Sequence, residues 1–86
     1  MTKSQKKINK DDVDSSVYLK QLGKRLKQIR IKKGYTNYEY FAFEHNIGRA
    51  QYGKYETGGN IQFDTLVAII KIHNMTLKDF FSEGFD

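Results

Sequence analysis

Apolar residues recur at intervals of three and four along most of this chain, a spacing that predicts amphipathic helices. The first predicted helix, about Ser16 to Lys33, has an apolar stripe made of Leu19, Leu22, Leu26 and Ile29. A wider apolar face predicts another helix over 63–70. The sequence TLKDFF at 76–81 predicts a short last helix that Thr76 and Asp79 cap. The chain contains no proline, and an all-α fold is therefore expected.

The segment 36–58 divides into two short helices joined by a tight turn. The first ends at 46–48, Asn-Ile-Gly, where asparagine can adopt the left-handed backbone conformation that such a turn needs. The second runs from Arg49 to about Glu56, and two glycines at 58–59 stop it. Two helices that cross over a turn of about three or four residues form a helix-turn-helix, whose second helix enters the DNA major groove.

The helix boundaries follow from capping residues. Gly34 is expected to end the first helix. The next helix begins in one of two ways: Thr36 caps it together with Glu39, or Asn37 caps it one residue later. The resulting core is expected to bury Leu26, Ile29, Ala42, Ile47, Tyr52, Leu66, Ile69 and Leu77 together.

Several short motifs follow one another in a characteristic order. They are Arg30 and Gly34, Phe-Ala at 41–42, Asn-Ile-Gly at 46–48, Tyr-Glu-Thr-Gly at 55–58, Phe63 and Leu66, Met-Thr-Leu at 75–77 and Phe-Phe at 80–81. Over about 19–81 this series resembles the phage-repressor and Cro type of helix-turn-helix, also called the XRE-like family. The resemblance implies a five-helix repressor-like DNA-binding domain. It also implies a structural ion pair between Arg30 and Glu56.

The chain departs from the family pattern at two places. Asn46 stands where the family usually has glycine at the turn. Thr36 lies six residues before Ala42, where five is usual, so one residue is extra near the start of the first motif helix. The family's polar DNA-contacting residue at this helix start therefore corresponds to either Asn37 or Tyr38.

Four exposed positions of the second motif helix are candidates for DNA contact once its two tyrosines are assigned to the core. Arg49 lies in the first turn, and arginine bonded to guanine through two hydrogen bonds is the commonest specific contact. Ala50 allows close approach or meets a thymine methyl group, and Gln51 can bond adenine or a phosphate. Lys54 can contact a second base or a phosphate. Gly53 indicates close approach of the helix backbone either to DNA or to a neighbouring helix.

By resemblance, Arg49, Ala50 and Lys54 match the base-contacting positions of the family, together with Asn37 or Tyr38. The candidates for contact with the DNA backbone are Gln51, Lys20, Lys24 and Thr57.

Charge is distributed unevenly along the 86 residues, whose net charge is +5. Residues 1–33 contain eleven Lys or Arg against three Asp, a net charge of +8, whereas residues 34–86 contain four against seven acids, or −3. This asymmetry favours an anionic partner on the N-terminal side. The expected organisation is a disordered arm over 1–14, a helix-turn-helix domain over 15–82 with its motif at about 37–56, and a tail over 83–86. The arm could reach phosphates or the minor groove through Lys3, Lys6, Lys7 and Lys10.

Other functional classes find little support in the sequence. His45 and His73 are isolated, and Gly58-Gly59 lacks the Lys-Ser/Thr of a phosphate loop. We therefore expect no enzyme activity, no metal and no cofactor. The chain has no cysteine and no apolar run of about 18 residues, and its N-terminus is polar. A cytoplasmic protein without a membrane span is expected.

These observations predict a sequence-specific DNA-binding transcription regulator, a repressor, that binds double-stranded DNA. A homodimer is expected because one recognition helix spans only a few base pairs. Phe80, Phe81 and Phe85 crowd a short C-terminal segment and predict that the dimer forms there. The alternative is a protein-interaction module on the same fold, antitoxin-like or coactivator-bridging, with a protein partner.

Overall fold

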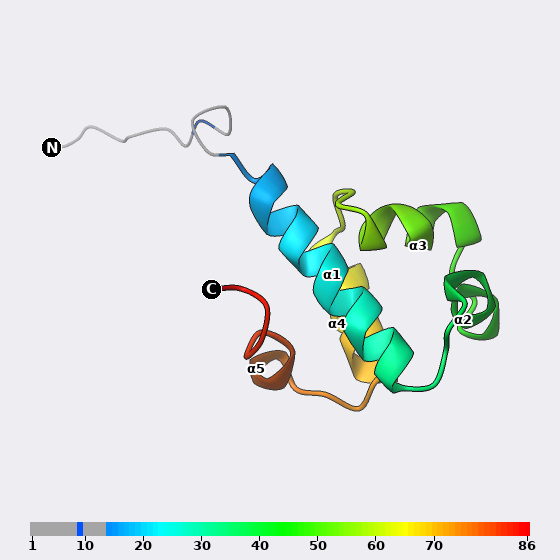
Figure 1. The fold of residues 1–86 in the computed structure, drawn as a ribbon. Helices are drawn as coiled ribbons and strands as arrows, with labels where there is room; N and C mark the ends of the chain where they lie inside the picture. The colour runs from blue at the N-terminus through cyan, green and yellow to red at the C-terminus, as the bar shows by residue number, and fades with distance from the viewer. Residues whose placement is uncertain (1–8, 10–13) are drawn as a thin grey trace, which may run out of the picture.

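The computed structural model describes residue 9 and residues 14–86, and this part of the chain contains five helices and no strands (Figure 1). The helices are α1 Ser16–Lys32, α2 Tyr38–Glu44, α3 Arg49–Glu56, α4 Phe63–Ile72 and α5 Leu77–Phe80. The all-α, five-helix prediction is confirmed. The predicted N-terminal arm and its lysines lie outside the described residues, except for Asn9 and Asp14.

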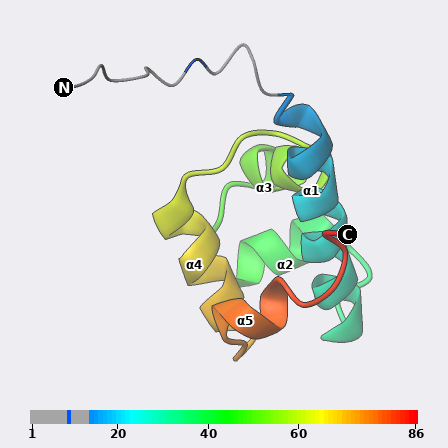
Figure 2. The same ribbon diagram turned by 90° about the vertical axis from the view of Figure 1, so that its left-hand side faces the viewer.

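α1 is the element on which the others assemble. It packs against α3 and α2, which also pack against each other, and α4 packs against α5. Figure 1 shows α1 crossing in front of α4, with α2 and α3 to one side, and Figure 2 shows α4 and α5 together. All five helices contribute to one buried core: Leu26, Ile29, Phe41, Ala42, Tyr52, Tyr55, Leu66, Ile69, Ile70 and Phe80.

The predicted core is largely correct. Six of its eight members are buried, and Ile47 is half-buried against the core. Leu77 is the error, because 37% of it is exposed. Leu77 is the first residue of α5, a helix of only four residues. The side of this short helix that faces the core carries Phe80, which is fully buried.

The first four helices all end in the same way. The residue after each C-cap has a positive φ angle, and the amide of the following residue donates a hydrogen bond back to a carbonyl in the last turn. This is the Schellman arrangement, which needs a residue that tolerates the left-handed conformation. The residues in this position are Gly34, Asn46, Gly58 and Asn74, with φ of 107°, 58°, 104° and 57°. Asn46 therefore replaces the family's usual glycine at a modest conformational cost.

The start of α2 is fixed by Asn37 and not by Thr36. The Asn37 side-chain oxygen accepts hydrogen bonds from the backbone amides two and three residues later, at 2.7 and 3.1 Å. At α5 the predicted capping box is present. The Asp79 amide donates to the Thr76 hydroxyl at 3.0 Å, and the Thr76 amide donates to the Asp79 carboxylate at 3.4 Å.

Arg25 has a different role from the one its basic neighbours suggest. It lies between the exposed residues Lys24 and Lys27 of α1, but only 6% of it is accessible. Its guanidinium donates to the backbone oxygens of Phe80 and Asp79, at 2.6 and 2.8 Å, and lies 5.6 Å from the centre of the Phe80 ring. Arg25 therefore attaches the end of α5 to α1.

The C-terminal phenylalanines pack mostly against one another within the domain. Phe80 is fully buried, and the Phe85 ring lies 5.0 Å from that of Phe81 and 6.1 Å from that of Phe80. Phe81 keeps 42% of its surface exposed. Most of the apolar surface that suggested a dimer at this segment is thus used inside one chain.

Gly23 sets the distance between α1 and α3. A Cβ atom added there would lie 2.5 Å from the carbonyl oxygen of Glu56 and 2.7 Å from that of Tyr55. Both atoms belong to the backbone of α3, so no side chain can move aside to make room. The two helices can meet this closely only because residue 23 has no side chain.

We predict that Gly23→Ala destabilises the domain by about 2–4 kcal/mol, because the new methyl group pushes α3 away from α1. This loss exceeds the gain of about 1 kcal/mol in helix propensity. Chemical denaturation measures the change. Gly48→Ala is the matched control, since its nearest atom outside the adjoining residues is 3.8 Å away. Equal stabilities of the two variants would contradict the close contact.

The His73 ring lies half-buried at the end of α4 and stacks on Phe41, with ring centres 5.3 Å apart. Its buried Nε2 atom has no hydrogen-bond partner among the described residues. Burial lowers the pKa of His73 from 6.5 to about 4, and the charges of Lys33 and His45 act in the same direction. The folded protein therefore holds this ring neutral at pH values where the unfolded chain protonates it.

We therefore predict that His73 makes the fold less stable in acid. The stability is complete above about pH 6.5 and is lost as the pH falls towards 4. The ring is partly exposed, so solvent screening limits the loss to about 1–2 kcal/mol. His73→Phe should retain the stacking and remove this component. Denaturation of both proteins at several pH values measures it, and parallel pH profiles would exclude the role of His73.

Candidate nucleic-acid interface

α3 has one buried and one exposed side. Tyr52 and Tyr55 face the core, with 0% and 9% of their surfaces accessible. The exposed residues are the four predicted for DNA contact: Arg49, Ala50, Gln51 and Lys54. Nothing in the described part of the chain forms an ion pair with Arg49 or Lys54. The solvent side of this helix therefore carries two cations that no described residue neutralises.

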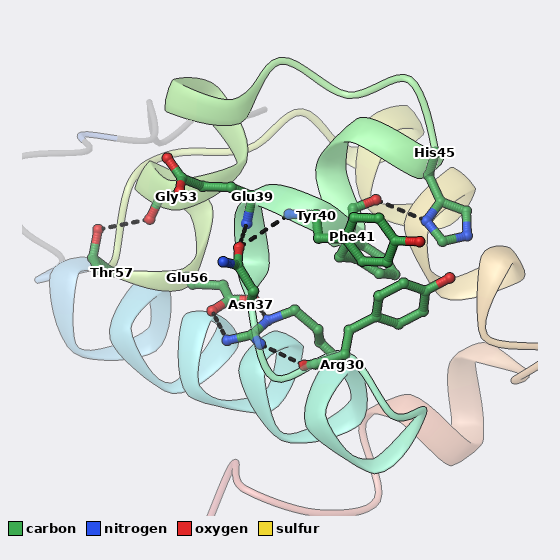
Figure 3. A network of polar contacts seen from close by, with 10 residues as sticks. Arg30, Asn37, Glu39, Tyr40, Phe41, His45, Gly53, Glu56 and Thr57 are labelled. Atoms are coloured by element: carbon green, nitrogen blue, oxygen red, sulfur yellow. Dashed lines mark hydrogen bonds and ion pairs between the residues drawn. The ribbon is translucent and has the colours of Figure 1, made fainter.

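A buried ion pair fixes the C-terminal end of α3 to α1 (Figure 3). Arg30 donates two hydrogen bonds to the Glu56 carboxylate, at 2.7 and 3.0 Å, and a third to the backbone oxygen of Tyr35 at 2.6 Å. The Arg30 and Glu56 side chains are only 4% and 7% accessible. The hydrogen bonds with Glu56 raise the pKa of Arg30. This pair and the contact at Gly23 orient α3 as a rigid element.

Gly53 accommodates the side chain of Tyr38 from α2. A Cβ atom at Gly53 would lie 2.8 Å from Cε1 of that ring. The Tyr38 ring also stacks on Tyr52, with centres 6.4 Å apart and planes inclined by 29°. The sequence left two explanations for Gly53, close approach to DNA or to a neighbouring helix. The structure shows the close approach to a neighbouring helix. Tyr38 lies beside α3, and 37% of its surface is exposed.

Two predicted contact residues already have hydrogen bonds within the domain. The Asn37 oxygen caps α2, which leaves its amide nitrogen as the group available for a partner. The Thr57 hydroxyl donates to the backbone oxygens of Gly53 and Lys54 at 3.0 and 3.2 Å. Thr57 could donate to a phosphate only by giving up these bonds.

A groove of about 510 Å³ lies between α1, the start of α2 and α3. Its lining consists of Lys27, Arg30, Tyr38, Ala50, Gly53, Lys54, Glu56 and Thr57. Four of the residues predicted to contact DNA meet here, namely Tyr38, Ala50, Lys54 and Thr57. The others, Arg49, Gln51, Asn37, Lys20 and Lys24, do not line it.

The lysines of α1 occupy different environments. Lys20 lies beside the turn after α3, because a Cβ atom at Gly58 would be 3.2 Å from its Cγ. Lys24 is exposed. Lys27, which sequence reasoning missed, lines the groove. It lies between Gly23 and Arg30, two of the α1 residues that contact α3, and this helical spacing is the signal that could have identified it.

A family model described as helix-turn-helix matches residues 26–80. No curated protein and no solved structure matches the chain. In the part of the chain that the structure describes, no helix is long and apolar enough to cross a membrane.

We predict that the Arg30–Glu56 pair is strongly coupled. Removing one partner, by Arg30→Met or Glu56→Leu, leaves a buried charge unpaired and should cost about 3–5 kcal/mol. The double variant should be less destabilised than the sum of the two single variants. Denaturation of all four proteins gives the coupling energy. Additive effects would show that the two charges do not stabilise each other.

Proposed function

Because this chain belongs to the helix-turn-helix family of the phage-repressor or XRE type, we propose that it is a repressor that recognises specific DNA sequences through α3. The family consists of DNA-binding transcription regulators and is generally not enzymatic. The observation that carries the proposal is the arrangement of α3, whose inner side and C-terminal end are held by buried contacts. Its exposed side, in contrast, carries small residues and two cations that form no ion pair among the described residues.

The exposed side of α3 offers a short series of complementary groups. Arg49 is in the first turn and can form two hydrogen bonds with one guanine. Ala50 has no bulk to hold the helix away from the bases and can meet a thymine methyl group. Lys54 follows further along α3 and contacts a second base or a phosphate. Gln51 lies beside this row and is assigned to the DNA backbone.

The start of α2 adds a second set of candidates. Tyr38 is held against α3 by its packing on Gly53 and Tyr52, so its exposed edge lies next to the groups that contact bases. Asn37 can offer its amide nitrogen. On α1, Lys20 and Lys24 remain proposed contacts with the DNA backbone.

We propose that the protein binds DNA as a homodimer. A helix of eight residues spans only a few base pairs, and a two-fold related pair doubles the sequence that is recognised. Repression needs no further site on the protein, because occupation of an operator that overlaps a promoter is sufficient.

The alternative proposal, a protein-interaction module of the antitoxin-like or coactivator-bridging kind, is favoured by one specific observation. Phe43 and Tyr40 on the outer side of α2 are 75% and 54% exposed. These two aromatic side chains, three residues apart on one helix, offer apolar surface to a protein partner. Titration of salt against binding to random duplex DNA separates the two functions. A DNA-binding protein loses affinity steeply as salt rises, whereas an interaction module has almost none to lose.

Selection of bound sequences from a random DNA pool tests the proposed function directly. A sequence-specific dimer should enrich two related half-sites about one helical turn apart, in inverted orientation. Enrichment of a single half-site would exclude the symmetric dimer, and no enrichment would exclude sequence-specific recognition.

We predict that Arg49→Ala costs about 1–3 kcal/mol at one base pair of the selected operator and removes the preference at that position only. Arg49→Lys is the control, because it keeps the charge and loses the two-bond geometry. It should therefore lose the same preference while retaining affinity for random DNA. Binding to the operator and its point variants measures both effects. Uniform weakening with base preference intact would show that Arg49 only positions the domain.

A further inference from the structure

The groove between α1, α2 and α3 is lined by both apolar surface and positively charged side chains. Ala50, Gly53 and the ring of Tyr38 contribute apolar surface, while Lys27 from α1 and Lys54 from α3 contribute charge. Such a surface is complementary to a nucleic-acid backbone, because its apolar groups can contact the sugar and its cations can contact the anionic phosphate.

The charge available in this groove comes from the two lysines. Arg30 also lines the groove, but its charge is matched by Glu56 through two hydrogen bonds. Lys27 and Lys54 are exposed and form no ion pair within the described residues. A ligand that enters the groove thus meets two unmatched positive charges on different helices.

We propose that this groove holds the DNA backbone beside the bases contacted by α3, and that Lys27 binds a phosphate there. The inference rests on the proposed function and extends it to a residue on α1. Ala50 and Lys54 belong both to the groove and to the exposed side of α3. A DNA strand whose bases reach α3 therefore places its sugar-phosphate chain along the groove, with a deoxyribose against Tyr38 and a phosphate near Lys27.

The geometry assigns this role to Lys27 and not to every α1 lysine. Lys32 belongs to the same helix but lines a separate groove, which also includes His73 and Met75 near the end of α4. Positions 27 and 32 are five residues apart, or about 140° around a helix, and so face different directions. Lys32 therefore provides a charge-matched control on the same element.

The test measures binding of the full chain to random-sequence and operator duplexes over a series of salt concentrations. Lys27→Ala should weaken binding to all sequences alike and reduce the slope of log affinity against log salt by about one unit. Lys32→Ala should leave the slope unchanged, and Lys27→Arg should restore it. Circular dichroism melting checks that each variant is folded. Equal effects of Lys27→Ala and Lys32→Ala would overturn the inference, because they would reflect net charge alone.

A second measurement uses operator duplexes in which single phosphates are replaced by uncharged methylphosphonates. At one position, the methylphosphonate should weaken DNA binding by the unaltered protein. The same replacement should not further weaken binding by Lys27→Ala. Absence of such a position would overturn the assignment of Lys27. If the unaltered protein shows no salt-dependent affinity for any duplex, the proposed function fails as well. If it binds DNA but fails only these comparisons, the proposed function stands and the groove is not its backbone site.

Discussion

The buried contact between α1 and the end of α3 is the constraint on which the rest of the structure depends. Two opposite charges are removed from water at Arg30 and Glu56, which is favourable only when the hydrogen bonds of both groups are satisfied. Two bonds between the side chains and a third to the Tyr35 oxygen meet most of this requirement. Gly23 lets the two backbones approach closely enough for this geometry. The orientation of the solvent-exposed side of α3 is thus determined by contacts that atoms on its opposite side make with α1.

The turns hold the remaining helices in register with this contact. Four helices end with glycine or asparagine in the left-handed position, and the amide of the next residue donates a hydrogen bond back to the last turn. In the turn before α3, the Ile47 amide donates to the Ala42 oxygen at 2.8 Å, and the half-buried Ile47 side chain packs against the core. Ala42 itself is completely buried where α2 and α3 meet. The crossing of the two motif helices is therefore fixed both by a small side chain and by a hydrogen-bonded turn.

Sequence reasoning captured the parts of the structure that follow from local chemistry. Apolar spacing gives the helices, and Gly34 and Asn46 give their ends, because these preferences act within a few residues. It failed where the partner lies far along the chain. Arg25 binds carbonyl oxygens 54 and 55 residues away, and Gly23 meets the backbone of a helix that local pattern does not place beside it. In the candidate site, the exposed residues of α3 were predictable from periodicity, whereas Lys27 required the packing of α1 on α3.

The extra residue before α2 and the glycine in α3 are best understood as one feature. Because Asn37 takes the capping position, Tyr38 becomes the first helical residue of α2 and its ring projects over residue 53 of α3. A Cβ atom at residue 53 would lie 2.8 Å from that ring, so a side chain there would displace Tyr38, and glycine avoids this at a cost of about 1 kcal/mol of helix propensity relative to alanine. Stacking of Tyr38 on Tyr52 offsets this cost. This arrangement places a large, partly exposed aromatic side chain beside the exposed side of α3. A departure from the family's spacing thus alters the groups that the domain presents to solvent beside α3.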